Sequence, residues 1–376
     1  MSAEVTSVDL DARRRRATPD DTLARADALL VETVAGLRAA LEAAAADGDP
    51  TDLRLAPPGA LAVDLTGELA ERSARPGKRL RPLLAHWGWV LAGGRADTHL
   101  DLTRVAAALE LLQLFALVQD DVMDRSDSRR GLPTLHVTAR DRHRTGGGVG
   151  DPELFGDSVA VLVSDLALSE ATLLIAPTTP EVRAAWRLMA VELVEGQLLD
   201  VTHTADRRRD LATSRRIARF KSGRYTISRP LQLGALVAGG GPDLVRRLVT
   251  WGDLVGDAFA VRDDVLGVWG DPALTGKPAG DDLRSGKPTA LLSWAAELLP
   301  GADRPLLAAC DAGTLDEAGV TALAAAMDRA GVRERAETAI SDSADRALAQ
   351  LDDLGADDEA ATALRSLVES IAWRSA

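Results

Sequence analysis

The sequence predicts an all-α protein, and three observations support this fold class. Leucine and alanine recur at the spacing of about 3.6 residues that marks one face of a helix. Alternating runs of β-branched residues are missing, so no sheet is expected. Hydrophobic residues make up 46% of the 376 residues, enough to bury a large core. We therefore expect a single all-helical domain at residues 21–376, after a disordered leader at residues 1–20 without the apolar stretch of a signal peptide.

The expected elements follow the chain in order. The first helix is predicted near Thr22–Ala46, and Pro50–Pro58 separates it from the next. Arg140–Pro152 contains TGGGVGDP and is predicted to be a mobile loop. A long amphipathic helix is predicted at residues 243–269. The pattern from Leu306 to Trp373 is helical without a catalytic signature, which indicates a segment that completes the helical packing.

Charge and cysteine content narrow the class of protein. The net charge of −13 argues against nucleic acid or an anionic membrane surface as the main partner. The one cysteine, Cys310, excludes a disulfide within the chain and fits a reducing cytoplasm. We find no apolar run expected to span a bilayer. These features favour a cytoplasmic protein.

The most informative segment is Gln119–His136, which reads QDDVMDRSDSRRGLPTLH. Hydrophobic spacing upstream predicts a helix, so Asp120 and Asp124 project from one of its faces. Carboxylates this close repel one another unless a cation lies between them, and Mg²⁺ with oxygen ligands suits such a place. Arg129 and Arg130 follow, with the forked donors that grip phosphate oxygens.

The lysines of this chain support a phosphate ligand. There are only four, in the contexts RPGKRLRP, FKSGR, LTGKPAG and RSGKPT. Solvated surface lysines would be scattered, whereas these four share polar, glycine-bearing surroundings. Their placement indicates positions where a compact point charge is required. They are Lys78, Lys221, Lys277 and Lys287.

A second aspartate pair mirrors the first. Asp263 and Asp264 stand near the C-terminal end of the helix predicted at 243–269, and the charged loop GDPALTGKPAGDDLRSGKPT follows. Two helices that each end in an aspartate pair, each followed by a basic loop, are expected to face one another across a cavity. One pair alone is usually a solvated surface, but the repetition favours a metal and phosphate site.

At this point the motifs resemble those of the trans-isoprenyl diphosphate synthases of the polyprenyl synthetase family, most like bacterial geranylgeranyl diphosphate synthases. They are GKRLRP at 77–82, DDVMD with RRGLPT at 120–134, GD at 156–157, EGQLLD at 195–200, KSG at 221–223, RDDVLG at 262–267 and GKPAGDDLRSGKPT at 276–289. The resemblance implies antiparallel helices around a deep central cavity and a homodimer. It also implies Mg²⁺-dependent condensation of isopentenyl diphosphate with dimethylallyl, geranyl or farnesyl diphosphate.

The resemblance also implies residue roles. Direct metal ligands would be Asp120, Asp124 and Asp263 on three Mg²⁺ ions per site, with Asp121 and Asp264 in support. The allylic diphosphate would be held by Arg129, Lys221, Ser222, Lys277 and Lys287, of which Lys221 is also counted as catalytic. Isopentenyl diphosphate would lie on Gly77, Lys78, Arg81, Gln113 and Arg130.

Product length is expected to depend on bulk before the first aspartate pair. Burial favours growth by about 0.8 kcal/mol per CH₂, so termination must be steric. Phe115 lies five positions before Asp120 and Ala116 four positions before it. A large aromatic only at the fifth position resembles the geranylgeranyl (C20) class. Farnesyl (C15) and longer-chain synthases stay open as alternatives.

Four positions depart from the family pattern: Gln119, Ser222, Ala260 and Gly267 stand where histidine, threonine, glutamine and a third aspartate are common. They leave substrate preference more open than reaction type. A class I terpene cyclase also uses an aspartate-rich helix, but its second metal motif normally carries asparagine or aspartate, then serine and glutamate. This chain has no asparagine and only 3% aromatic residues. A non-catalytic subunit of a heteromeric synthase would be expected to lack some of these aspartates or lysines.

Overall fold

The chain divides into two compact units, which are described one at a time. The structure, a computed structural model, describes residues 17–47, 61–75, 77–207, 209–271 and 280–373. One unit comprises Met1–His86 with Gly94–Thr179, and the other comprises Trp87–Gly93 with Pro180–Ala376. The expected single domain at 21–376 stays a prediction. Residues 1–16 of the expected leader and the Pro50–Pro58 segment lie outside the described residues.

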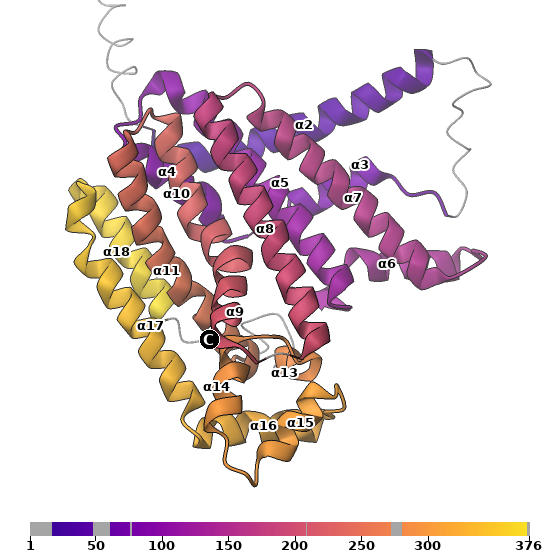
Figure 1. Cartoon of the computed structure of the whole chain (residues 1–376). Helices are drawn as coiled ribbons and strands as arrows, with labels where there is room; N and C mark the ends of the chain where they lie inside the picture. Colours follow the sequence, from indigo (N-terminus) through magenta and orange to yellow (C-terminus); the bar gives the residue numbers. More distant parts are fainter. Residues whose placement is uncertain (1–16, 48–60, 76, 208, 272–279, 374–376) are drawn as a thin grey trace, which may run out of the picture. The chain divides into compact units, whose positions relative to one another are not determined.

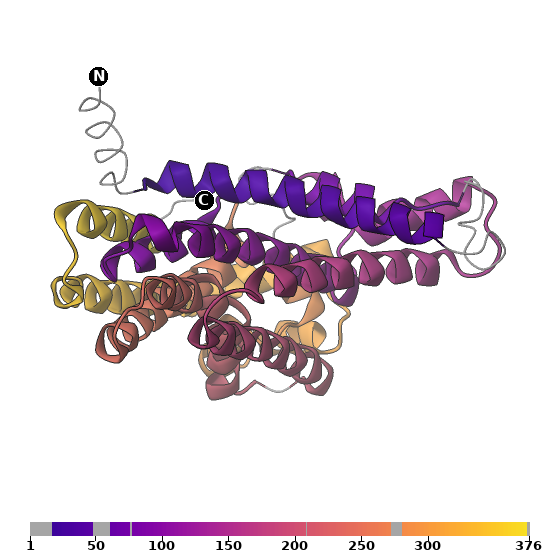
Figure 2. The same ribbon diagram turned by 90° about the horizontal axis from the view of Figure 1, so that it is seen from above.

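The first unit is built around helix α5, His99–Met123. Its run of five residues from Val105 to Leu109 is fully buried, as expected for a helix that neighbours surround on all sides. The long helix α2 packs against α5 (Figure 2), and so does α7. The other elements of this unit are α3 Leu65–Ser73, η1 Ala96–Thr98, α6 Leu135–Thr145 and the first part of α4 Leu80–Leu91. Helix α2 spans Pro19–Asp47, which confirms the predicted first helix with slightly wider bounds.

A small β-hairpin follows α5, which corrects the expectation of no sheet. Strands β1 (Ser128–Arg129) and β2 (Leu132–Pro133) pair antiparallel. The two residues between them, Arg130 and Gly131, have φ values of 54° and 73°. Positive φ at both central positions is the geometry of the tight hairpin turn that matches strand twist. Strands of two residues are too short to leave a pattern in the sequence.

Helix α7 (Pro152–Ile175) corrects a second expectation. It is long and apolar enough, by length and composition, to cross a membrane, although the sequence reading found no such run. It packs against α5 and α6, and 44% of its most apolar window is buried. A buried core helix of a soluble protein can have the same length and apolar composition, so these two properties alone are weak evidence that α7 crosses a membrane. The predicted loop at Arg140–Pro152 is wrong for residues 140–145, which form the end of α6.

The second unit contains most of the remaining helices. Their bounds are α8 Pro180–Asp206, α9 Leu211–Ile217, η2 Ala218–Ser228, α10 Arg229–Val237, α11 Pro242–Trp269, α13 Asp281–Ser285, α14 Ala290–Leu298, α15 Arg304–Asp311, α16 Glu317–Arg329, α17 Val332–Ala349, η3 Asp352–Leu354 and α18 Asp358–Ala372. Helix α11 confirms the predicted helix at 243–269 to within one residue. On one side it packs against η2 and α10, and on another against α17 and α18, which run side by side in Figure 1. The helical pattern predicted for Leu306–Trp373 is confirmed.

The π-helix η2 lies in backbone contact with both α8 and α11. A Cβ built on Gly196 of α8 would lie 2.7 Å from the backbone nitrogen of Lys221. A Cβ built on Gly256 of α11 would lie 2.9 Å from the Gly223 Cα. Only glycine permits such approaches, because any side chain would force the helices apart. A π-helical turn of this kind is often found at functional sites. Here it carries Lys221.

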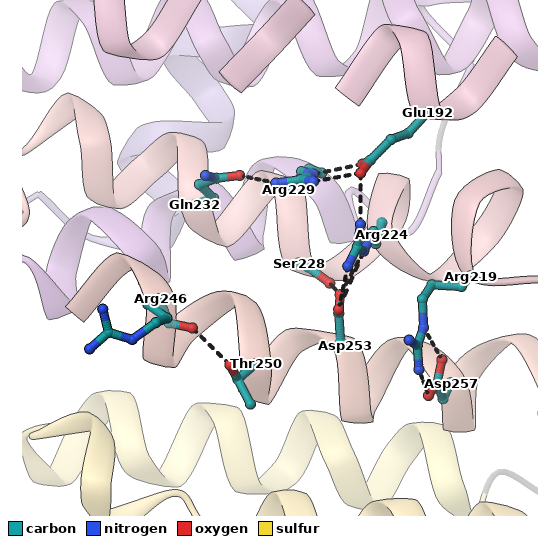
Figure 3. A network of polar contacts seen from close by, with 10 residues as sticks. All are labelled: Glu192, Arg219, Arg224, Ser228, Arg229, Gln232, Arg246, Thr250, Asp253 and Asp257. Carbon is teal, nitrogen blue, oxygen red and sulfur yellow. Dashed lines mark hydrogen bonds and ion pairs between the residues drawn. The ribbon is translucent and has the colours of Figure 1, made fainter. Parts of the chain in front are cut away.

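Charged side chains hold η2 in place, as Figure 3 shows. Glu192 of α8 accepts hydrogen bonds from Arg224 at 2.7 Å and from Arg229 at 2.6 and 2.8 Å. Arg224 also donates to Asp253 of α11 at 2.9 Å, and Ser228 donates to the same carboxylate at 2.6 Å. The network therefore joins α8, η2 and α11 through charge-assisted hydrogen bonds.

Candidate active site

The first aspartate cluster stands at the end of α5. Asp120 and Asp121 belong to its last turn, and Asp124 is the residue that ends the helix. The Asp124 nitrogen donates to the Asp120 carbonyl at 2.8 Å, so helical geometry continues to Asp124. This places the carboxylates at 120 and 124 one turn apart, as the sequence predicts.

Arg129 returns from the hairpin onto this cluster. Its guanidinium lies 2.6 Å from Asp121 and 3.2 Å from Asp120. Burial alone would lower the Arg129 pKa, but the hydrogen bond to Asp121 and the nearby carboxylates raise it above its ordinary value. The arginine therefore stays charged and neutralises part of the repulsion between the aspartates. Its predicted contact with a diphosphate stays a prediction.

Residues predicted for isopentenyl diphosphate come together in the same unit. A Cβ on Gly77 would lie 3.5 Å from the nearest nitrogen of Arg130, so these two positions are neighbours. Lys78 is exposed. Arg79 instead points to carboxylates: it pairs with Asp27 at 2.8 Å and with Glu110. In the GKRLRP motif, Arg79 therefore has a structural part, while Gly77 and Lys78 stay accessible. The predicted partners Arg81 and Gln113 are partly exposed.

The second aspartate cluster stands near the end of α11. Asp264 is partly exposed, and its pKa is raised well above the ordinary value by desolvation and then by the charges of Asp282, Asp263 and Asp200. Lys287 acts in the opposite direction but does not cancel them. Carboxylates that raise one another's pKa in this way repel each other, and a divalent cation would relieve that repulsion.

Asp200 of α8 forms an ion pair with Lys221 of η2 and so holds this lysine near the same cluster. The lysine nitrogen lies 2.5 Å from the Asp200 carboxylate, which is 9% exposed. The pair depends on the close approach of α8 and η2 at Gly196. Its neighbour Ser222 is partly exposed. The roles of Lys221 and Ser222 in substrate binding stay predictions.

Lys287 follows α13 in a segment held by arginines. Arg207 donates to the Ser285 carbonyl at 2.8 Å, and Arg209 donates to the Lys287 carbonyl at 3.0 Å. The Lys287 ammonium lies 3.8 Å from Asp282. These two hydrogen bonds hold the backbone at Ser285 and Lys287 and so fix the position from which the Lys287 side chain extends. Lys277 lies outside the described residues.

The donor chemistry of both clusters suits Mg²⁺, a cation that prefers oxygen ligands and keeps several waters. Within the described residues, no group of three or more His, Cys, Asp or Glu side chains is gathered as a ready-made metal site. Mg²⁺ bound by few carboxylates commonly completes its coordination with water and phosphate oxygens. Oxygen ligands of this kind are offered by Asp120 and Asp124 at the end of α5 in the first unit and, separately, by Asp263 of α11 in the second unit.

The positions expected to control product length lie on α5. Phe115 is buried at 9% exposure, and Ala116 is partly exposed. Gln119, one turn on from Phe115, donates to Ser164 of α7 at 3.1 Å. This side of α5 therefore faces α7. Ala260 is buried in α11.

Two site residues were not singled out from the sequence. Asp200 ends the EGQLLD motif, and Asp282 lies within GKPAGDDLRSGKPT. Both are acidic residues inside motifs that carry the family resemblance, and this was the signal that the sequence offered. Their partners Lys221 and Lys287 are 21 and 5 residues away. Only the fold reveals that Asp200 meets Lys221.

The family model for polyprenyl synthetases matches residues 64–327, more than half of the chain. The chain therefore belongs to the polyprenyl synthetase family, a family of Mg²⁺-dependent prenyltransferases.

Its relatives make products of different length. A geranylfarnesyl diphosphate synthase of Aeropyrum pernix is 33% identical over 58% of this chain and 66% of its own length. A farnesyl diphosphate synthase of Mycobacterium tuberculosis is 35% identical over 58% of this chain and 56% of its own length. The chain thus matches no more than about two thirds of either relative.

A solved structure gives the wider match. The geranylgeranyl pyrophosphate synthase of Corynebacterium glutamicum, in complex with isoprenyl diphosphate and magnesium, has a TM-score of 0.81 and is 35% identical. The match covers 93% of this chain and 99% of that protein. This likeness agrees with the predicted all-α fold.

Proposed function

We propose that this protein catalyses the Mg²⁺-dependent head-to-tail condensation of isopentenyl diphosphate with allylic diphosphates. The observation that carries the proposal is the pair of aspartate clusters at the ends of α5 and α11, each followed by basic side chains on a short turn or loop. Carboxylates alone would repel each other, and basic side chains alone would attract any anion. Together they suit a complex of diphosphate with divalent cations.

Each set of residues has a part in the reaction. Asp120, Asp124 and Asp263 would hold three Mg²⁺ ions, and these ions would supply the positive charge that neutralises a diphosphate leaving group. Arg129 and Lys221, with the other lysines of the site, orient that diphosphate. The allylic carbon then becomes cationic, and the double bond of isopentenyl diphosphate attacks it. A proton is lost to the departed diphosphate, so no further base is needed.

The second substrate is held by a separate set of residues. Gly77, Lys78 and Arg130 lie near one another in the first unit, and we assign Arg81 and Gln113 of the same unit to this set as well. A backbone glycine with two cationic side chains suits a diphosphate without a metal. This arrangement supports the assignment of isopentenyl diphosphate to these residues.

We propose geranylgeranyl diphosphate (C20) as the main product, against farnesyl or longer products. Phe115 is the large aromatic side chain on α5 before the aspartates, and the small Ala116 beside it leaves room for the growing prenyl chain. Burial of each added CH₂ group favours further growth of the prenyl chain, so a large side chain must block its elongation. Phe115→Ala should therefore shift products beyond C20, and Ala116→Phe should shorten them towards C15.

The experiment is incubation of purified protein with labelled isopentenyl diphosphate and each allylic primer, followed by chromatography of the dephosphorylated products. Absence of any prenyl product with every primer would reject the synthase. An active enzyme whose profile is unchanged in both variants would reject only the role of Phe115 and Ala116, and another helix would then set the length.

We further propose a cytoplasmic homodimer. Helix α8 exposes large apolar side chains at a spacing of three or four residues, which places them on one side of the helix. They are Leu188, Val191, Val194, Leu198 and Val201. Contiguous apolar surface of this kind is unusual on a monomer, and a second copy would cover it. Light scattering of Leu198→Asp should report a loss of mass relative to the native protein, and an unchanged mass would reject this surface.

A further inference from the structure

The two aspartate motifs of this chain differ in one position. The first reads DDVMD at residues 120–124, and the second reads DDVLG at residues 263–267. Gly267 thus takes the place in the second motif that Asp124 takes in the first. On a helix this position is one turn from Asp263, on the same face. Helix α11 therefore offers one carboxylate fewer than the end of α5.

A carboxylate from another element occupies the space next to Gly267. A Cβ built at this glycine would lie 2.7 Å from an oxygen of Asp282. Asp282 comes from the short helix α13, whose start is fixed to the same place: the Gly280 nitrogen donates to the Gly267 carbonyl at 2.8 Å. Gly280 has a φ of 80°, which lets the chain turn directly into α13.

The surroundings of Asp282 connect it with both parts of the site. One oxygen of its carboxylate lies beside Gly267, one helical turn from Asp263. Its other carboxylate oxygen lies 3.8 Å from the Lys287 ammonium. The carboxylate therefore lies between the aspartate pair of α11 and a lysine assigned to diphosphate.

We propose that Asp282 supplies the third carboxylate of the second aspartate cluster, in the place that Gly267 leaves open, and supports the cation assigned to Asp263. This inference rests on the proposed function, because it concerns the same metal site. A carboxylate in this place would bind the cation or one of its water molecules, and it also orients Lys287. Loss of such a supporting group typically costs 10–100-fold in metal affinity.

Metal binding tests the proposal without turnover. Mn²⁺ would be titrated into the protein in the presence of inorganic diphosphate, with free Mn²⁺ followed by electron paramagnetic resonance. Asp282→Asn keeps the shape of the side chain and should weaken Mn²⁺ binding by about 10-fold or more. The matched control is Asp281→Asn on the same helix, whose carboxylate pairs with Arg284 and should leave Mn²⁺ affinity unchanged.

A double variant tests whether the carboxylate must lie beside residue 267, in addition to whether its charge is needed. Gly267→Asp alone brings two carboxylates together and should not improve binding. Combined with Asp282→Ala, the new aspartate has room and should restore Mn²⁺ affinity above that of Asp282→Ala alone. Circular dichroism of each variant confirms that it is folded.

The outcomes separate this proposal from the function itself. Native Mn²⁺ affinity in Asp282→Asn would overturn the role of Asp282, and so would a folded double variant that binds no better than Asp282→Ala. Failure of the native protein to form any prenyl product would reject the synthase instead, whatever the Mn²⁺ titrations give.

Discussion

Replacement of Glu192 by alanine should strongly destabilise the second unit. Glu192 is buried and accepts three charge-assisted hydrogen bonds, one from Arg224 and two from Arg229 (Figure 3). Arg229 itself is only 5% exposed, so water cannot replace the lost carboxylate. Removing one partner of a buried ion pair costs about 3–5 kcal/mol. Asp253 still pairs with Arg224, which places the expected loss near the lower end, about 3 kcal/mol.

An exposed pair in the same unit provides the control. Arg246 pairs with Asp243 at 2.7 Å near the start of α11, but the two side chains are 70% and 74% exposed. Such surface pairs contribute about 0–1 kcal/mol. Arg246→Ala should therefore leave stability almost unchanged, although it removes an ion pair of similar length.

Urea unfolding followed by circular dichroism measures both variants. The free energy of unfolding should fall by about 3 kcal/mol for Glu192→Ala and by less than about 1 kcal/mol for Arg246→Ala. Equal losses in the two variants, or a loss below about 1 kcal/mol for Glu192→Ala, would refute the reasoning from burial.

Three further predictions concern the site and pH. Asp120→Ala and Asp263→Ala should each cut turnover by at least about 10²-fold while the protein stays folded, and near-normal activity in Mg²⁺ would contradict the metal assignment. Lys78→Ala should raise the KM for isopentenyl diphosphate and Lys221→Ala that for the allylic substrate; equal weakening of one substrate in both would contradict two separate sites. Burial, and then the charge of Arg25, lowers the pKa of His99, so its neutral form is favoured in the folded state. Stability should therefore be full above the ordinary histidine pKa of about 6.5 and fall as pH drops below it. The urea midpoint should fall less between pH 7.5 and 5.5 in His99→Gln, and an identical fall would exclude this histidine as a cause.

Local pattern was enough to predict the elements that carry the aspartates. Helices α5 and α11 follow from apolar residues spaced along one stretch of chain, because helix formation and burial of one face depend on near neighbours. The same reasoning located the aspartate pairs near the helix ends. It failed at residues 140–145, where the glycine run suggested a loop but the chain continues α6. The basic residues Arg142, His143 and Arg144 in the last turn suit a helix C-terminus.

The contacts that place side chains in the site required the tertiary structure. The sequence alone determined the fold class, the two aspartate clusters and the basic motifs, since each is written in one continuous segment. That Asp200 meets Lys221, or that Asp282 lies beside Gly267, depends on how separate elements approach. Glycines at these approaches decide the distance between backbones, and sequence spacing does not reveal which backbone comes near. The sequence thus specified the chemical groups, while packing of α8, η2, α11 and α13 decided which of them act together.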